Sequence, residues 1–287
     1  MAIRTPIAWG ADQFRLAGLA FRSASDDVHP TEGDVRYPLP AIRRIGAADL
    51  KDVLARGFGD FGANRTDVIF LCVFYPLVGL VLQRLAAGYE MLPLLFPLAS
   101  GFALVGPVAA VGLYEMSRRR EQGDNVGWTD AFGVVRSPSF GAIVLLGLLL
   151  TAIFVLWLLV AEAIYLVTLG PEPPASIAVF LRDVFTTGAG WVLIGVGGGV
   201  GFLFALLVLA ISVVSFPLLL DRDVGLEAAV WTSVRAVVAN PGPMAIWGLT
   251  VAGGLVIGSI PLFVGLVIVL PVLGHSTWHL YRKVMPR

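Results

Sequence analysis

The sequence predicts an all-α membrane protein with six transmembrane helices, arranged as three repeated units of an interfacial amphipathic helix plus a helical hairpin. The first observation behind this prediction is composition: 57% of the 287 residues are hydrophobic and only 14% are charged. Soluble domains carry about 25% charged residues. The second observation is a series of long apolar runs, and the third is a short amphipathic pattern that recurs before pairs of these runs.

The apolar runs define six predicted spans. A bilayer core about 30 Å thick needs roughly 20 apolar residues in a helix. The last two runs are separated by Gly258-Ser259-Ile260-Pro261, a turn sequence that makes them two helices rather than one. The six predicted spans are residues 67–85, 91–117, 140–169, 190–220, 244–260 and 262–280.

The chain divides into a polar leader and a transmembrane domain. Residues 1–46 are polar, and residues 22–38 hold turn formers without periodic hydrophobes. We therefore expect a partly disordered leader, followed by a six-helix transmembrane domain over residues 47–287. The leader has no early apolar run of the kind that a cleavable signal peptide needs.

The basic residues predict the orientation. With six spans, 18 of the 20 Lys and Arg residues fall on one side of the membrane, and only Arg84 and Arg182 fall on the other. Basic residues beside transmembrane helices stay in the cytoplasm. The sequence therefore predicts that both termini are cytoplasmic. The formal net charge is zero, which argues against a nucleic-acid partner because phosphate neutralisation needs an excess of basic residues.

An internal repeat is indicated by the segments before the hairpins. Trp128-Thr129 precedes Ser137-Pro138 by nine residues, and Trp231-Thr232 precedes Asn240-Pro241 by the same spacing. Apolar residues at helical spacing in these segments, and again near Leu50, predict helices that lie along the membrane surface. A proline then ends the helix, and the chain turns into the membrane. Three such units suggest a pseudo-threefold bundle.

Small residues and prolines mark the spans. The steps Gly195/Gly199, Gly197/Gly201 and Gly254/Gly258 have the spacing that lets helices pack closely. A flexible helix beside a substrate path is the alternative interpretation of the glycines. The second helix of every hairpin also contains a proline, which we interpret as a kink; these prolines are Pro107, Pro217 and Pro271.

Few charged residues approach the predicted spans. Glu162 lies about 22 residues into the third span, near its outer end, where a snorkelling side chain or an ion-binding role is possible in principle. Glu115 precedes Arg118 and Arg119, with which it is expected to pair. Asp221 and Arg222 close the fourth span at the cytoplasmic surface.

The end of the sixth span holds the sharpest local pattern. His275 and His279 are four residues apart and therefore share one helix face. This spacing can ligate a metal, but no carboxylate or cysteine lies nearby in sequence. The main interpretation is an aromatic and basic anchor at the headgroups, with the histidines hydrogen-bonded to neighbouring cytoplasmic helices. The sequence predicts no catalytic set and no cofactor, and the single cysteine, Cys72, offers no disulfide.

Three separated motifs, taken in order, carry a resemblance to a known family. They are Gly106-Pro107-Val108-Ala109-Ala110-Val111-Gly112-Leu113-Tyr114-Glu115-Met116-Ser117-Arg118-Arg119, Phe216-Pro217-Leu218-Leu219-Leu220-Asp221-Arg222, and Gly274-His275-Ser276-Thr277-Trp278-His279-Leu280-Tyr281-Arg282. The chain resembles the bacterial integral membrane proteins grouped as domain of unknown function twenty-one eighty-nine, over roughly residues 35–285. The resemblance implies a protein of the bacterial inner membrane and supplies no activity.

Three functions follow as hypotheses. The first is a non-enzymatic structural, assembly or interaction module, with the lipid bilayer and other inner-membrane proteins as its partners. A small transporter or channel component is the second, suggested by the repeat and the kinked helices. A redox or metal-binding accessory, resting on His275 and His279, is the third. A polar cavity reaching mid-membrane would favour transport, and a core filled with Leu, Val and Phe would favour the module. Oligomeric state and ligand are outside what the sequence determines.

Overall fold

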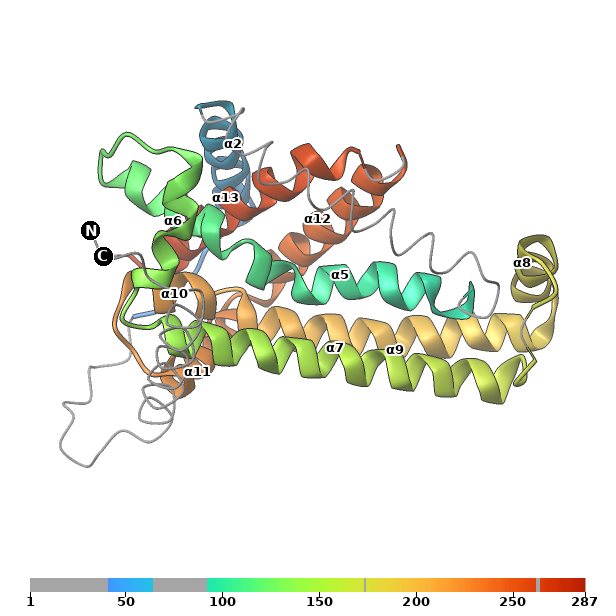
Figure 1. Cartoon of the computed structure of the whole chain (residues 1–287). Helices are drawn as coiled ribbons and strands as arrows, with labels where there is room; N and C mark the ends of the chain where they lie inside the picture. The colour runs from blue at the N-terminus through green and yellow to red at the C-terminus, as the bar shows by residue number, and fades with distance from the viewer. Residues whose placement is uncertain (1–40, 64–91, 173, 262–263, 287) are drawn as a thin grey trace, which may run out of the picture.

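The computed structural model describes residues 41–63, 92–172, 174–261 and 264–286 (Figure 1). Within these residues every regular element is a helix. The predicted span at residues 67–85, Cys72 and the leader up to residue 40 lie outside the described residues.

Two long helices form the axis of the molecule. α7 (Phe140–Thr168) and α9 (Gly188–Ser212) pack against each other, and α5 (Leu95–Ala109) packs against both (Figure 1). α7 ends one residue before the predicted span at 140–169. Its 29 residues correspond to roughly 43 Å of helix, enough to cross a bilayer core and protrude.

A short helix at the far end of this pair was missed by the sequence analysis. α8 (Ile177–Thr186) begins after Ser176, whose hydroxyl accepts a hydrogen bond from the backbone N–H of Val179 at 3.2 Å. A serine before an apolar periodic run was the available signal. The large side chains of Ile177 and Phe185 are exposed, which suits a helix at the membrane surface.

Two spans predicted as single helices are divided beside their prolines. The predicted span 91–117 consists of the short 3-10 helix η1 (Leu92–Leu94), α5, and α6 (Val111–Glu121), with a turn at Ala110. The predicted span 190–220 consists of α9 and α10 (Ser215–Asp221), with a break at Val213 and Val214. Proline has no N–H to donate and clashes with the carbonyl four residues earlier. For Pro217 that carbonyl belongs to Val213, where α9 gives way to α10.

The last two predicted spans correspond to α12 (Pro241–Ser259) and α13 (Leu266–Val284). α12 ends inside the predicted turn, and Pro241 occupies its first position, where a missing N–H costs nothing. α13 contains Pro271 without a break and runs four residues beyond the predicted end of its span. Its second half is polar but buried: His275, Ser276 and Thr277 all face protein.

Within the described residues, three stretches are long and apolar enough to cross a membrane: α7, the stretch Gly188–Asp221 formed by α9 and α10, and α12. The polar second half of α13 explains its absence from this set, because His275, His279, Arg282 and Lys283 interrupt its hydropathy.

The segments predicted to lie along the membrane surface are helical. They are α2 (Ala47–Ala63), the 3-10 helix η2 (Trp128–Arg136) and α11 (Leu226–Ala239). η2 ends at Arg136, directly before Ser137-Pro138, and α11 ends at Ala239, directly before Asn240-Pro241, as these steps predicted. Trp128 and Trp231, at equivalent positions of the repeat pattern, are 41% and 57% exposed, respectively. Exposed tryptophans suit the headgroup region.

Each of these three helices packs on one member of a group of three helices that also contact one another. α2 packs on α13, η2 packs on α6, and α11 packs on α10, while α6, α10 and α13 contact one another in all three pairs. Figure 1 shows these elements gathered at one end of the long helices. The approach of α2 to α13 depends on Gly57, since a Cβ atom there would lie 2.9 Å from the backbone nitrogen of Ser276.

The glycine prediction is only partly right. A Cβ atom at Gly254 or Gly258 would touch α13, so the close approach predicted for that step is present. Gly201 likewise faces Trp157, whose ring would lie 3.0 Å from an added Cβ atom. Among the described residues, however, a Cβ atom at Gly195 or Gly199 would meet nothing within 4 Å. That step does not bring two described helices together, because its face of α9 points away from them.

The core between the long helices is apolar. Large buried side chains there include Leu146, Leu150, Trp157, Val208 and Ile211. Trp157 is the polar exception, and its indole N–H donates to the carbonyl of Pro97 at 3.2 Å. Nearly all of the buried charged groups lie instead where α2, α6, α10 and α13 meet.

Candidate functional site

The candidate site is a network of charged side chains at that meeting point, here called the polar junction. It comprises three neighbouring groups of hydrogen bonds and ion pairs, each of which joins different helices. Its members are Asp60 of α2, Glu115, Ser117, Arg118, Arg119, Arg120 and Glu121 of α6, Asp130 of η2, Asp221 of α10, and His275, Trp278, His279, Tyr281 and Arg282 of α13.

The first group links α2, α6 and α13 through Asp60. Its carboxylate oxygen Oδ2 lies 2.8 Å from Nε2 of His279 and accepts a hydrogen bond from the Ser117 hydroxyl at 2.7 Å. Arg120 lies 3.3 Å from the other carboxylate oxygen. Burial alone would raise the pKa of the Asp60 carboxyl, but hydrogen bonds from His279 and Ser117 lower it further than burial raises it. Asp60 is therefore a buried carboxylate that stays ionised.

The hydrogen bonds of this group define the state of His275. Oγ of Ser117 also lies 2.8 Å from Nδ1 of His275. Because Ser117 has a single hydroxyl proton and gives it to Asp60, Nδ1 of His275 must be the donor in the second contact. The proton of a neutral imidazole is then on Nδ1, and Nε2 carries a lone pair. Nε2 is buried and has no hydrogen-bond partner among the described residues.

The second group surrounds Glu115, which is 1% exposed. Its two carboxylate oxygens accept hydrogen bonds from Nε of Arg118 at 2.7 Å and from Nε of Arg119 at 2.6 Å. Arg119 also reaches Asp130 of η2 at 2.6 Å. The hydrogen bond with Glu115 raises the pKa of both guanidinium groups. This geometry confirms the pairing predicted from sequence and connects α6 to η2.

The third group joins α6, α10 and α13. Arg282 donates two hydrogen bonds to the carboxylate of Asp221, at 2.8 and 2.9 Å, and a third to Glu121 at 2.9 Å. The hydroxyl of Tyr281 donates to Asp221 at 2.7 Å. A bidentate pair between arginine and carboxylate is among the strongest polar contacts in proteins. The guanidinium also lies over the ring of Trp278, 4.8 Å from its centroid.

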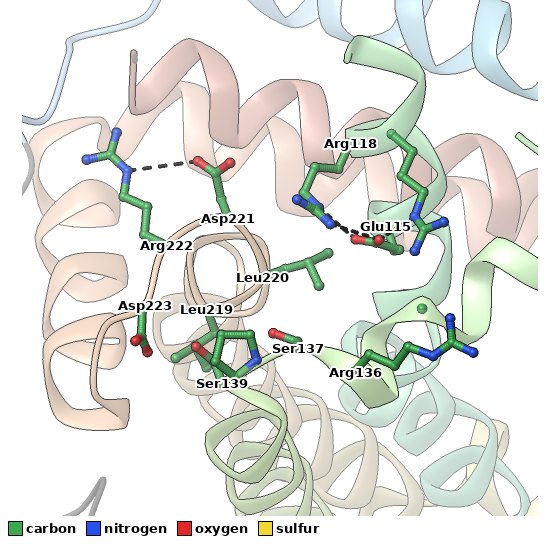
Figure 2. A pocket seen from close by; sticks show the side chains of 13 residues that line it. Glu115, Arg118, Arg136, Ser137, Ser139, Leu219, Leu220, Asp221, Arg222 and Asp223 are labelled. Carbon is green, nitrogen blue, oxygen red and sulfur yellow. Dashed lines mark hydrogen bonds and ion pairs between the residues drawn. The ribbon is translucent and has the colours of Figure 1, made fainter. Parts of the chain in front are cut away.

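A cavity of about 370 Å³ opens beside the second and third groups. Figure 2 shows Glu115 and Arg118 on one side of it, Asp221 and Arg222 on the other, and Ser137 and Ser139 between. The contact between Arg222 and Asp221 is long, 3.9 Å. A smaller cavity of about 140 Å³ lies near His279 and Lys283.

The structure brings together most of the residues that the sequence singled out. Glu115, Asp221, His275 and His279 all belong to the polar junction, and Arg222 lines its larger cavity. Glu162 does not belong to it, because it lies near the opposite end of α7, six residues before Thr168.

The sequence analysis missed Asp60, the residue on which the first group centres. Asp60 stands between Phe58 and Phe61 at the end of an amphipathic helix. A lone acidic residue among apolar positions was the only available signal, and its partners Ser117 and His279 are 57 and 219 residues away.

Both histidines of the predicted pair are engaged with neighbouring helices, as the main interpretation expected. His279 contacts Asp60 of α2, and His275 contacts Ser117 of α6. Within the described residues, no group of three potential ligands is placed to hold a metal ion.

These features define the class of protein. Three stretches of the described residues suit a membrane by length and composition, and an apolar core lies between the long helices, so the chain is an α-helical integral membrane protein. Residues 95–221 match the family described as predicted integral membrane protein (DUF2189), the family that the resemblance indicated. The match contains the motif at 106–119 and nearly all of that at 216–222, and the motif at 274–282 lies beyond it. Comparison with curated proteins and with solved structures finds no match.

Proposed function

We propose that this protein is a non-enzymatic interaction or assembly module of the bacterial inner membrane. The polar junction supports this role because its charges are used to hold helices together. Asp221 binds Tyr281 and Arg282 of α13, and Asp60 binds Ser117 of α6 and His279 of α13. Glu115 binds Arg119 of its own helix, and Arg119 in turn binds Asp130 of η2. A junction of this kind fixes the shape of one membrane face, and a fixed face is what a partner protein needs in order to dock.

The topology that we propose has six spans and places both termini in the cytoplasm. The polar junction then lies at the cytoplasmic surface, where the basic residues gather. The three units would form a pseudo-threefold bundle. Support comes from the packing rule, in which each surface helix contacts the second helix of the preceding unit: α2 on α13, η2 on α6, and α11 on α10. The three mutual contacts of α6, α10 and α13 suit a central position around such an axis.

Reporter fusions test this topology. A reporter active only outside the cytoplasm is expected to be active after residues 88 and 174 and inactive after residue 287. In the proposed topology one span precedes residue 88 and three precede residue 174, whereas six precede residue 287. The matched control is a cytoplasm-active reporter at the same three sites, which should give the opposite pattern. Activity of the first reporter at the carboxyl terminus would contradict the topology.

The alternative role, a small transporter or channel component, has less support. The core between α7 and α9 is filled by Leu146, Leu150, Val208 and Ile211. The larger cavity lies at the end where α7 begins rather than midway along it. A redox accessory would need a set of metal ligands, and no group of three potential ligands is placed to hold a metal ion within the described residues. His279 is bonded to Asp60, and the free Nε2 atom of His275 is buried.

Purification in a gentle detergent from the native membrane tests the role. We expect a defined protein partner to co-purify in constant ratio, and to be lost from a variant in which the shape of the junction is broken, Asp60→Asn. The exposed Asp52→Asn variant is the control and should retain the partner. A protein that purifies alone with a bound solute would contradict the module and favour transport. A coloured or metal-loaded preparation would favour the redox accessory.

A further inference from the structure

The cavity of about 370 Å³ beside the polar junction is lined partly by charged and polar groups that do not hold helices together. It lies between α6, η2, α10 and Ser139, the residue that precedes α7 (Figure 2). α7 is apolar and long enough to cross a membrane. The cavity therefore opens at the membrane surface from which α7 departs, at the depth of the lipid headgroups.

The side chains that line the cavity carry a net positive charge once those paired with each other or with Arg282 are set aside. Glu115 is neutralised by Arg118 and Arg119, and Asp221 is held by Arg282. Of the other lining residues, Arg136 makes no ion pair within the described part of the chain. Arg222 makes one long ion pair, 3.9 Å from Asp221, and donates a hydrogen bond to the carbonyl of Pro286 at 3.2 Å.

Asp223 is the remaining carboxylate of the lining, and it is exposed. Two guanidinium groups thus stand against one carboxylate after the internal pairs are counted. Their forked donors match the geometry of phosphate oxygens.

A buried hydroxyl adds a donor that has no protein partner. Ser139 lines the cavity, is 3% exposed, and its Oγ atom makes no hydrogen bond among the described residues. A buried hydroxyl without a partner costs free energy. Ser139 is also the N-cap residue of α7, yet its side chain does not cap the helix. The positive end of the α7 dipole therefore faces the cavity without a side-chain acceptor.

We propose that this cavity binds the phosphate group of an anionic phospholipid. Arg136 and Arg222 would hold the phosphate oxygens, while Ser139 and the amino end of α7 would donate to them from the floor. A lipid is favoured over a soluble phosphate by the neighbouring surface of η2, where Trp128, Phe132 and Val135 are exposed beside Arg136. Such side chains insert among headgroups and acyl chains. The proposal requires α7 to span the membrane, but it is independent of the module role proposed above.

The test measures binding of water-soluble short-chain phosphatidylglycerol to the full chain in a neutral detergent by calorimetric titration. Short-chain phosphatidylcholine and inorganic phosphate are titrated in parallel. We expect phosphatidylglycerol to bind at least about tenfold more tightly than either. Phosphatidylcholine carries a cationic ammonium group that Arg136 and Arg222 repel, and inorganic phosphate has no acyl chain to lie against η2. The double variant Arg136→Gln with Arg222→Gln should weaken phosphatidylglycerol binding by at least about tenfold, and Ser139→Ala should weaken it several-fold.

The matched control removes two positive charges elsewhere. Arg56→Gln with Arg182→Gln changes the net charge equally at residues that do not line this cavity. This control should bind phosphatidylglycerol as the unmodified protein does, and the thermal midpoint of each variant in detergent verifies that it is folded. Equal weakening in both double variants would overturn the proposal, as would equal binding of phosphatidylcholine. Inorganic phosphate that bound as tightly as phosphatidylglycerol would overturn the lipid assignment.

Discussion

Replacing Asp60 by asparagine is expected to lower the free energy of unfolding by about 3 kcal/mol. The carboxylate of Asp60 lies within hydrogen-bond distance of His279 and Ser117 and within ion-pair distance of Arg120. Asparagine has nearly the same size but no charge, so the contacts to His279 and Arg120 lose their ionic component in a buried place. A chain of this length should then unfold in detergent at a temperature lower by roughly 6–12 °C.

The control lies on the same helix. Asp52 also pairs with cations, Arg56 at 3.0 Å and Lys283 at 2.8 Å, but its side chain is 40% exposed. Exposed pairs contribute about 0–1 kcal/mol. Asp52→Asn is therefore expected to shift the unfolding temperature by only a few degrees, and a shift as large as that of Asp60→Asn would contradict the special position of Asp60.

The dependence of unfolding on pH separates the charge of Asp60 from its shape. The pKa of Asp60 is lower in the folded protein than its ordinary value of 3.8. Its stabilising contribution is thus fully present above that value and is lost as the pH falls through the lower pKa of the folded state. Between about pH 5 and pH 3 the unmodified protein should lose stability more steeply than Asp60→Asn. Parallel curves for the two proteins would refute this assignment.

Glu115→Gln is expected to destabilise the protein by a similar amount, about 3 kcal/mol. Glu115 is 1% exposed and neutralises both Arg118 and Arg119, whose side chains are 26% and 29% exposed. Without the carboxylate, two adjacent guanidinium groups repel each other, and of the two only Arg119 keeps an ion-pair partner among the described residues, Asp130. Chemical unfolding in mixed micelles, followed by helical circular dichroism, measures the loss.

A double-mutant cycle tests the physical cause of this loss. Combining Glu115→Gln with Arg118→Gln removes both members of one pair, so the double variant should be more stable than the sum of the two single losses predicts, by roughly 1–3 kcal/mol. Asp130→Asn is the control, since Asp130 pairs with Arg119 from a more exposed position, 26% against 1% for Glu115. Additive losses for Glu115 and Arg118 would show that their ion pair does not stabilise the fold.

The two variants differ in what they connect. Asp60 holds α2 to α6 and α13, whereas Glu115 holds α6 to η2 through Arg119. If α2 and η2 are held independently, Asp60→Asn should speed the exchange of amide hydrogens in α2 alone, and Glu115→Gln should speed it in η2 alone. Hydrogen exchange of the backbone amides in α2 and η2 reports this difference directly.

Much of this protein was determined by local sequence. The ends of α7 and α12, the Ser-Pro and Asn-Pro stops of η2 and α11, and the pairing of Glu115 with Arg118 follow from apolar runs, backbone restrictions and helical spacing. Each of these signals acts over a few residues, or over one helix, so it can be read without knowledge of the neighbours.

The breaks at Ala110 and Val213 were not fixed by their prolines alone. Pro107, Pro217 and Pro271 looked equivalent in the sequence, yet their helices differ. α5 passes Pro107 and ends two residues later, α9 ends before Pro217, and α13 continues through Pro271. A proline always removes one hydrogen bond, but the surrounding helices decide whether the chain kinks or stops.

Only the tertiary structure decided how the polar residues meet. Asp60 and His279 are 219 residues apart, and Asp221 and Arg282 are 61 apart. Neither contact can therefore be predicted from the residues near it in the sequence. Charges buried at the end of a helix bundle must find opposite charges, but many arrangements of helices could satisfy that need. The packing of α2 against α13 at Gly57, and of α6 against α10 and α13, selects one of them.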